Sequence, residues 1–299
     1  MKMDFNQIKE IGGRYLFQNY GRQDIAFTKG EGMYLYDTKG EKYLDLVGGI
    51  AVCALGYSHP EWVSIMQEQV AKLVHVSNLY HVEEQAALAQ NIATITPGDL
   101  NRTLFVNSGA EANEAALKLA VRYNVGRTHI LSALNGFHGR TSASLGATGQ
   151  TKYQQSFEPL ISDAYRYYEY GNDESLQMMV DKNTAAIIVE PIQGEGGVVQ
   201  ADNSFYKLIR DLCDDTGALM IVDEVQTGMG RTGEWFGIEH YGITPDIITM
   251  AKGLGGGMPI GACVTTDEIS AVMTPGSHGT TFGGNPLVCA SGNAVINIM

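Results

Sequence analysis

Four polar residues each stand at the end of an apolar run, where their side chains could do chemistry. Ser108 follows TLFV after one asparagine, Glu190 ends AAIIVE, Asp223 follows ALMIV and Lys252 follows IITMA. A serine and a glycine at the start of a helix suit a phosphate group, because the free backbone N–H groups there attract an anion. A carboxylate at the end of a buried strand is costly to desolvate unless it meets a positive partner, such as a protonated ring nitrogen.

Each of these residues also has an ordinary structural explanation. Asn107 or Ser108 could simply cap a helix. Glu190 and Glu195 could be solvated acids in a glycine-rich loop, and the lysine could extend from the surface. The combination favours a cofactor site, because pyridoxal 5′-phosphate (PLP) needs a Schiff-base lysine, an acid beside its pyridine nitrogen and a phosphate site.

The elements around these residues alternate between strand and helix. Buried strands are predicted at residues 103–106, 185–190, 218–222 and 247–251. Helices are predicted from Pro60, over 83–95, over 108–123 and from Ser204. Strands that are apolar on both faces indicate a largely parallel sheet covered by helices, in which ligands bind beyond the carboxyl ends of the strands. The sequence therefore predicts an α/β fold, preceded by a short hairpin that turns at residues 38–40.

A rival interpretation comes from residues 228–233, GMGRTG, which match the G-x-G-x-x-G pattern of dinucleotide-binding turns. Such a turn should follow a strand directly and open a helix. Here Asp223 to Thr227 intervene, and the following EWFGIEHYGITPD lacks a sustained helical period. We therefore interpret the glycines as turn residues, and keep a nucleotide-dependent oxidoreductase as the alternative from another class of function.

Composition narrows the class of protein further. The 299 residues carry a net charge of −13, which argues against nucleic acid or an anionic membrane as a partner. The four cysteines form no C-x-x-C, so we expect a reduced, cytoplasmic protein. The sequence shows no signal or transit peptide and no membrane-spanning run of about 18 apolar residues. The seven histidines have no metal-ligand spacing, so no metal is expected.

Several motifs, in order along most of the chain, resemble one family. They include VNSGAEANEAALKLA, GFHGRT, VEPIQGEGGV, VDEVQTGMGRTG, DIITMAKGLGGGMPIGA and HGTTFGGNP. From about residue 20 to its end, the sequence is similar to the class III (subgroup II) aminotransferases of PLP fold type I. The resemblance implies a three-layer α/β large domain at residues 55–299 with a mostly parallel sheet. It also implies that residues 1–54 are the N-terminal part of a small α+β domain.

The resemblance assigns roles in the cofactor site. Lys252 matches the Schiff-base lysine, and Asp223 matches the acid beside the pyridine nitrogen. The other matches are Ser108, Gly109 and Ala110 at the phosphate, Phe137 on the ring, Gln226 near the 3-hydroxyl, and Thr281 at the phosphate of the neighbouring subunit. The match at Thr281 implies a homodimer with shared active sites. His138 is expected to be a neutral, packed histidine.

For the substrates, Arg140 matches the arginine that takes a carboxylate, and Glu195 the glutamate that governs dual-substrate recognition. Tyr20 resembles a substrate-contacting tyrosine. Ile50 stands where ornithine aminotransferases tend to carry tyrosine, which favours a donor with a blocked chain end, although ordinary core packing also explains an isoleucine.

The expected reaction is a ping-pong transfer of the amino group from N-acetylornithine to 2-oxoglutarate. Its products are N-acetylglutamate 5-semialdehyde and glutamate, and it belongs to arginine biosynthesis. Succinylornithine, ornithine, N-acetyl-LysW-type lysine intermediates and 4-aminobutyrate stay open as donors. An aminomutase, a decarboxylase and a non-catalytic relative stay open as other functions.

The sequence ends at Met299 within a predicted helix. The family continues into a C-terminal lobe that completes the small domain and carries the arginine expected to partner Glu195. We therefore expect this chain to lack the lobe, to expose apolar surface near residues 1–54 and 285–299, and to be poorly active alone.

Overall fold

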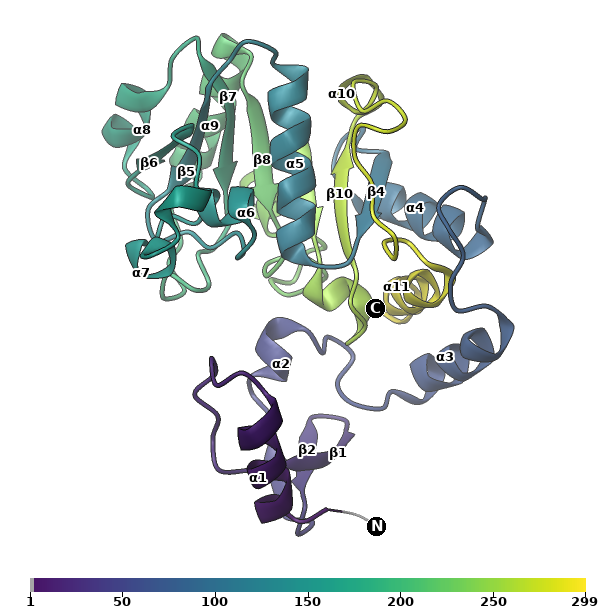
Figure 1. Ribbon diagram of the computed structural model, residues 1–299. Helices are drawn as coiled ribbons and strands as arrows, with labels where there is room; N and C mark the ends of the chain where they lie inside the picture. The colour runs from purple at the N-terminus through teal and green to yellow at the C-terminus, as the bar shows by residue number, and fades with distance from the viewer. Residues whose placement is uncertain (1–2) are drawn as a thin grey trace.

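The computed structural model describes residues 3–299 and is built around a seven-stranded sheet (Figure 1). Its order is β4-β10-β9-β8-β7-β5-β6. The strands are β4 (Arg102–Val106), β5 (His129–Ala133), β6 (Tyr165–Tyr168), β7 (Thr184–Val189), β8 (Leu219–Asp223), β9 (Ile247–Met250) and β10 (Gly261–Thr265). Neighbouring strands from β9 to β6 are parallel, whereas β10 is antiparallel to both β9 and β4. The predicted, mostly parallel sheet is therefore confirmed.

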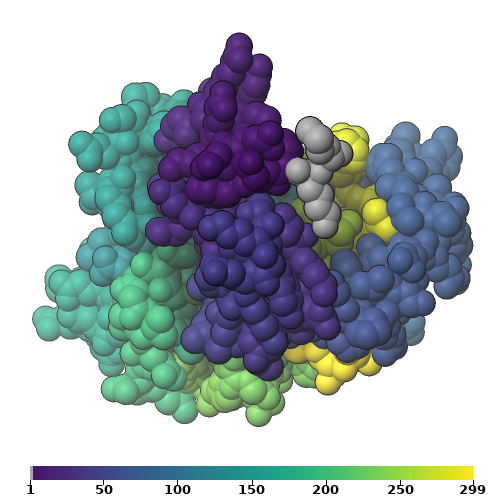
Figure 2. Space-filling model, turned by 90° about the horizontal axis from the view of Figure 1, so that it is seen from below, coloured from purple at the N-terminus to yellow at the C-terminus, as the bar shows by residue number. Residues whose placement is uncertain are grey.

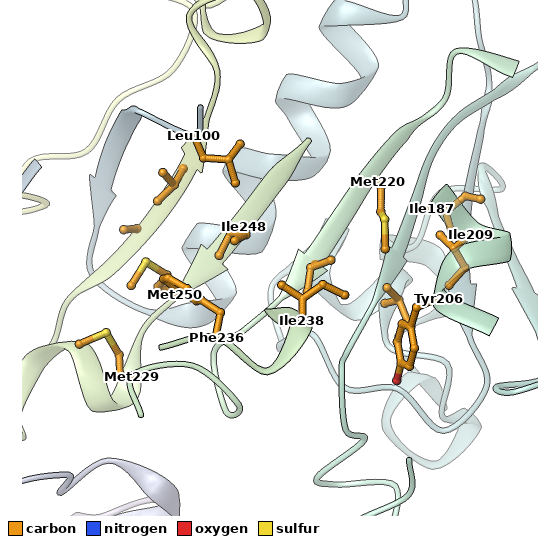
Figure 3. Close-up of a cluster of buried hydrophobic side chains, with 14 of the residues drawn as sticks. Leu100, Ile187, Tyr206, Ile209, Met220, Met229, Phe236, Ile238, Ile248 and Met250 are labelled. Atoms are coloured by element: carbon orange, nitrogen blue, oxygen red, sulfur yellow. The ribbon is translucent and has the colours of Figure 1, made fainter. Parts of the chain in front are cut away.

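Alternate side chains of the central strands enter two different cores, which is why these strands are apolar throughout. In β7, Ile187 and Val189 belong to one buried cluster, whereas Ala186 and Ile188 belong to the other. Figure 3 shows part of the first cluster, including Met220, Ile248 and Met250 from the strands and Tyr206, Ile209, Phe236 and Ile238 from covering segments.

Helices close both cores and complete a three-layer α/β fold. Helix α5 (Gly109–Tyr123) covers one face with Ala115, Ala116 and Leu119. The other face is covered by α4 (Glu83–Ile95), α9 (Asn203–Thr216) and α11 (Pro286–Ile298). The remaining helices are α3 (Pro60–Lys72), α6 (Ser142–Ala147), α7 (Thr151–Gln154), α8 (Asp173–Met179) and α10 (Asp267–Ser270), with the 3-10 helices η1 (Glu158–Leu160), η2 (Gly237–Tyr241) and η3 (Lys252–Gly255).

The N-terminal residues form a smaller group of elements below the large sheet (Figure 1). They are α1 (Phe5–Tyr15), β1 (Phe27–Glu31), β2 (Tyr34–Asp37), β3 (Lys42–Leu44) and α2 (Gly48–Ala51). The predicted hairpin is confirmed as β2–β3, and β1 adds a third antiparallel strand. Seen from below in Figure 2, this group covers the middle of the face.

The expected exposure of apolar surface is confirmed within residues 3–54 and mostly wrong at residues 285–299, where Met299 is 48% exposed but most apolar side chains are buried or half-buried. Within residues 3–54, Phe17 is 90% exposed and Leu46 is 87% exposed. Helix α11 instead packs against α3, α4 and η3, and buries Val288, Cys289 and Val295. Helix α11 is therefore part of the core around the large sheet. Residues 1–2 lie outside the described part of the chain.

Three strands of the large sheet are absent from the sequence-based prediction. They are β5, β6 and β10, which read HILSA, YRYY and GACVT. Each is short and includes polar or small residues, so none stands out as an apolar run. Pairing with neighbours, rather than local sequence, gives them their strand conformation. Within residues 3–299, no helix combines the length and apolar character needed to cross a membrane.

Candidate active site

A cavity of about 440 Å³ lies at the carboxyl edge of the large sheet. Because the parallel strands end at the same edge, residues far apart in sequence meet there. Nine predicted site residues line it: Ser108, Gly109, Ala110, Phe137, Arg140, Glu195, Asp223, Gln226 and Lys252. Three other residues discussed above do not line the cavity: Tyr20, Ile50 and Thr281. All three are exposed, Tyr20 to 70%. Val52, close to Ile50 in the sequence, does line the cavity.

One side of the cavity is the N-terminus of α5. The Ser108 hydroxyl accepts the N–H of Glu111 at 3.2 Å, so this serine does cap the helix. The N–H groups of Gly109 and Ala110, in the first turn, have no acceptor within the helix, as at any helix start. A Cβ on Gly109 would lie 2.7 Å from Val225 Cγ1, so glycine permits this close approach. The arrangement can bind an anion with backbone N–H groups.

Asp223 is 4% exposed and lies at the centre of a buried hydrogen-bond network. Its Oδ2 accepts from Asn113 Nδ2 and from His138 Nδ1, both at 2.7 Å, and its Oδ1 accepts from the N–H of Val225 at 3.0 Å. Asn113 Oδ1 in turn accepts from the Thr249 hydroxyl at 2.7 Å. A carboxylate accepts about four hydrogen bonds, so these three donors leave a position for a ring N–H.

Asn113 and His138 are the members of this network that the sequence-based site lacks. Asn113 stands on the apolar face of α5 and is 1% exposed. A polar residue at a core position of a helix indicates a buried hydrogen bond, and this was the sequence feature that could have identified Asn113. His138, expected as a neutral packed residue, is buried against Asp223. Burial lowers the pKa of His138, but the hydrogen bond and charge of Asp223 and the charge of Glu190 outweigh it, so the pKa is raised.

Glu190, at the end of β7, is a buried acid at the cavity. Its Oε2 accepts the backbone N–H of Phe137 at 3.0 Å, which fixes the loop carrying that ring. Burial raises the pKa of Glu190 to about 7, and Asp223 adds to this, while His138, the Phe137 N–H and Lys252 oppose it. From the sequence alone, Glu190 could be a solvated acid in a glycine-rich loop. The structure instead shows that it is buried and lines the cavity.

We expect Glu190→Gln to change how stability depends on pH. The folded-state pKa of Glu190 lies above its ordinary value of 4.5, so between about pH 4.5 and 7 the folded chain binds more protons than the unfolded chain. Stability contributed by this group is therefore lost as pH rises through that window. Thermal melts of the apoprotein across the window should show a shallower decline for Glu190→Gln than for wild type. The exposed Glu195→Gln should match wild type, and equal slopes in all three proteins would contradict the prediction.

Lys252 begins η3, separated from the end of β9 by Ala251, and its side chain reaches the cavity. Its φ is +43°, in the left-handed region that non-glycine residues rarely adopt, and such strain concentrates at functional sites. Burial lowers the pKa of Lys252, although Asp223, Glu195 and Glu190 partly offset the effect. A lysine with a lowered pKa sheds its proton more readily and can act as a nucleophile or a base.

Aromatic and charged side chains stand at the mouth of the cavity. The Arg140 guanidinium lies 4.0 Å from the ring centre of Tyr153 and 5.6 Å from that of Phe137. Arg140 and Glu195 are both exposed, so each can meet an incoming molecule. An arginine in this position can bind a carboxylate with two parallel hydrogen bonds.

The glycines of GMGRTG do not form a dinucleotide-binding turn. The residues after β8 form successive turns, and no α-helix opens there. Gly230 and Gly233 have φ values of +74° and +101°, which glycine adopts without strain. The carboxylate of Glu224, whose pKa burial raises to about 7, anchors the segment by accepting from the N–H groups of Gly237 and Ile238.

The residues at this cavity fit PLP. The free N–H groups at the start of α5 suit its phosphate, the remaining position on Asp223 suits its protonated ring nitrogen, and Lys252 suits its aldehyde. The cofactor is pyridoxal 5′-phosphate.

Comparisons with known proteins agree with this geometry. The sequence model of the family described as Aminotransferase class-III matches residues 16–299. The chain is 48% identical over 286 residues to an acetylornithine aminotransferase of Archaeoglobus fulgidus, covering 96% of this chain and 75% of that protein. It is 49% identical to an acetylornithine aminotransferase of Caldanaerobacter subterraneus, covering 95% and 72%.

Solved structures show the same relationship. The ornithine aminotransferase of Toxoplasma gondii matches with a TM-score of 0.94 and 30% identity, covering all of this chain and 72% of that one. The acetylornithine aminotransferase of Elizabethkingia anophelis matches with a TM-score of 0.85 and 31% identity, covering 99% and 73%. The chain therefore belongs to the class-III aminotransferases, which are PLP-dependent enzymes.

Proposed function

We propose that this protein transfers the amino group of N-acetylornithine to 2-oxoglutarate, giving N-acetylglutamate 5-semialdehyde and glutamate, a reaction of arginine biosynthesis. The observation that carries the proposal is the convergence of Lys252, Asp223 and the start of α5 on one cavity. The choice of donor rests on the curated relatives, which are named acetylornithine aminotransferases at 45–49% identity over most of the chain.

Bound PLP supplies an electron-accepting ring that weakens the bonds to the substrate Cα. Asp223 would keep the ring nitrogen protonated, and Asn113 and His138 hold its carboxylate in place through hydrogen bonds. Lys252 would hold the cofactor through its aldehyde, and its amine would move the proton at the Cα of the donor. Its lowered pKa favours the neutral amine that both tasks need. Phe137 and Gln226 line the same cavity, where Phe137 would stack on the ring and Gln226 would lie near its 3-hydroxyl.

The two substrates differ in charge, so we assign their recognition to the charged residues at the cavity mouth. Arg140 takes a substrate carboxylate through its guanidinium. Glu195 faces the same cavity with the opposite charge and distinguishes the donor from the dicarboxylic acceptor. Tyr20 contacts substrate in the assembled enzyme.

The assembly that we propose is a homodimer with shared active sites, in which Thr281 reaches the phosphate bound by the partner. The exposure of this threonine leaves it available for such a contact. Residues 1–54 belong to a small domain and residues 55–299 to the PLP-binding large domain. We place the protein in the cytoplasm, because its cysteines are reduced and unpaired among the described residues.

The proposal is tested with the chain supplied with PLP. Borohydride reduction followed by peptide mass spectrometry should place a pyridoxyl group on Lys252. A panel of amino donors with 2-oxoglutarate should then rank N-acetylornithine above ornithine and 4-aminobutyrate in kcat/KM. An adduct on another lysine contradicts the site, whereas a different preferred donor contradicts only the substrate.

A further inference from the structure

Three tyrosine hydroxyls converge on one backbone carbonyl beside the active site. The carbonyl oxygen of Pro191 lies 2.6 Å from the Tyr206 hydroxyl and 3.2 Å from the hydroxyls of Tyr170 and Tyr241. Tyr206 comes from α9, Tyr170 follows β6, and Tyr241 ends η2, so three separate elements meet at this point. We call these three residues the tyrosine cluster.

The hydroxyls of Tyr170 and Tyr206 also lie 2.5 Å from each other, so the cluster shares its donors between this contact and the carbonyl groups of the loop. Tyr206 is fully buried, and its hydroxyl points away from the apolar side chains of Ile209 and Met220 (Figure 3). Burial raises the pKa of Tyr206 and raises that of Tyr170 to about 12, so both hydroxyls keep their protons. Strand β7 ends at residue 189, so no sheet partner serves the buried Pro191 carbonyl. The tyrosines meet the requirement that a buried carbonyl be hydrogen-bonded.

The carbonyl that they hold belongs to the loop that carries both active-site glutamates. Glu190 precedes Pro191 and accepts the N–H of Phe137, and the Tyr170 hydroxyl also lies 3.2 Å from the Glu190 carbonyl. Farther along, Gln193 donates from its side chain to the carbonyl of Leu134 at 2.9 Å. Glu195 stands beyond these two anchors, at the cavity mouth.

We propose that Tyr206, supported by Tyr170 and Tyr241, is a positioning residue that fixes the 190–195 loop and so sets how Glu195 meets the amino donor. The inference rests on the proposed function for the role of Glu195. The position of the loop itself rests only on the contacts described above.

The first test measures the amide hydrogen exchange of the loop in the absence of substrate. Tyr206→Phe keeps the ring and removes the shortest hydrogen bond to Pro191. Amide hydrogen exchange of residues 192–197 should become roughly five-fold faster, the factor that the loss of one hydrogen bond represents. Tyr168→Phe is the matched control, because Tyr168 is also fully buried and its hydroxyl donates to the carbonyl of Ile188 at 3.2 Å, within β7 and before the loop begins.

The second test measures the steady-state kinetics with the amino donor. In the PLP-loaded chain, Tyr206→Phe should raise the KM for N-acetylornithine roughly three- to ten-fold and change kcat by less than about two-fold. Tyr168→Phe should change neither. In a Glu195→Gln background, Tyr206→Phe should add no further increase in KM, because residues that act through one another are not additive.

The outcomes separate the inference from the function. Equal exchange rates in Tyr206→Phe and wild type, or equal acceleration in both tyrosine variants, would overturn the positioning role. An additive effect of Tyr206→Phe in the Glu195→Gln background would overturn the link to Glu195. Faster exchange in Tyr206→Phe alone, with wild type preferring another amino donor to N-acetylornithine, would support the loop anchor and contradict the proposed substrate instead.

Discussion

Lys252→Ala should lower kcat by about 10³-fold or more, because the variant loses the residue that we propose as both nucleophile and proton carrier. Among the described residues that line the cavity, Lys252 is the only lysine. Alanine leaves Phe137, Asp223 and the start of α5 in place, so PLP should still bind, without a covalent bond. Steady-state rates and cofactor binding by absorbance, measured on the same preparation, check both parts.

The matched control for this variant is Lys207→Ala. Lys207 is exposed on α9 and pairs with Asp211, so its removal should leave kcat unchanged. Retention of more than a tenth of the wild-type rate by Lys252→Ala would show that another group moves the Cα proton.

Asp223→Ala should have the second-largest effect and lower kcat by about 10²- to 10³-fold, the usual loss when a preorganised electrostatic group is removed. The substitution also leaves the buried side chains of Asn113 and His138 without their acceptor, which should cost about 3 kcal/mol of unfolding free energy. Asp223→Asn keeps the shape of the side chain but removes its charge. This variant should therefore recover part of the lost unfolding free energy but not the lost kcat. Denaturant melts and steady-state kinetics on both variants separate these effects.

Gly230→Ala provides the comparison within the same segment. Gly230 has a φ of +74°, so alanine there should cost about 1–2 kcal/mol of stability through backbone strain. Its effect on kcat should stay below about ten-fold, because the glycine does not line the cavity. If Asp223→Ala and Gly230→Ala lost activity equally while both still bound PLP, the assignment of Asp223 to the ring nitrogen would be wrong.

Much of the large domain was predictable from local sequence. Strands β4, β7, β8 and β9 are apolar runs because each contributes to two cores, and the residue after each run necessarily lies at the carboxyl edge. The strand pattern alone therefore predicts that Ser108, Asp223 and Lys252 lie close together. The helices α3, α4, α5 and α9 followed from the spacing of their apolar residues.

Other features of the site depend on contacts that no local pattern encodes. Asn113 and His138 stand 110 and 85 positions from Asp223, and their role is set by which buried polar groups face each other. The buried state of Glu190, which raises its pKa, results from segments that pack around the end of β7. The burial of α11 against α3 and α4 likewise required the complete core.

The sequence by itself therefore determined the strand-end residues and the cofactor chemistry, because an apolar run and the polar residue that ends it are adjacent in the chain. Only the tertiary structure decided what holds those residues in place: the partners of Asp223, the buried acid Glu190 and the tyrosines at the Pro191 carbonyl. Hydrogen bonds between distant segments depend on a few ångströms of packing, and residue type and spacing do not specify packing at that scale.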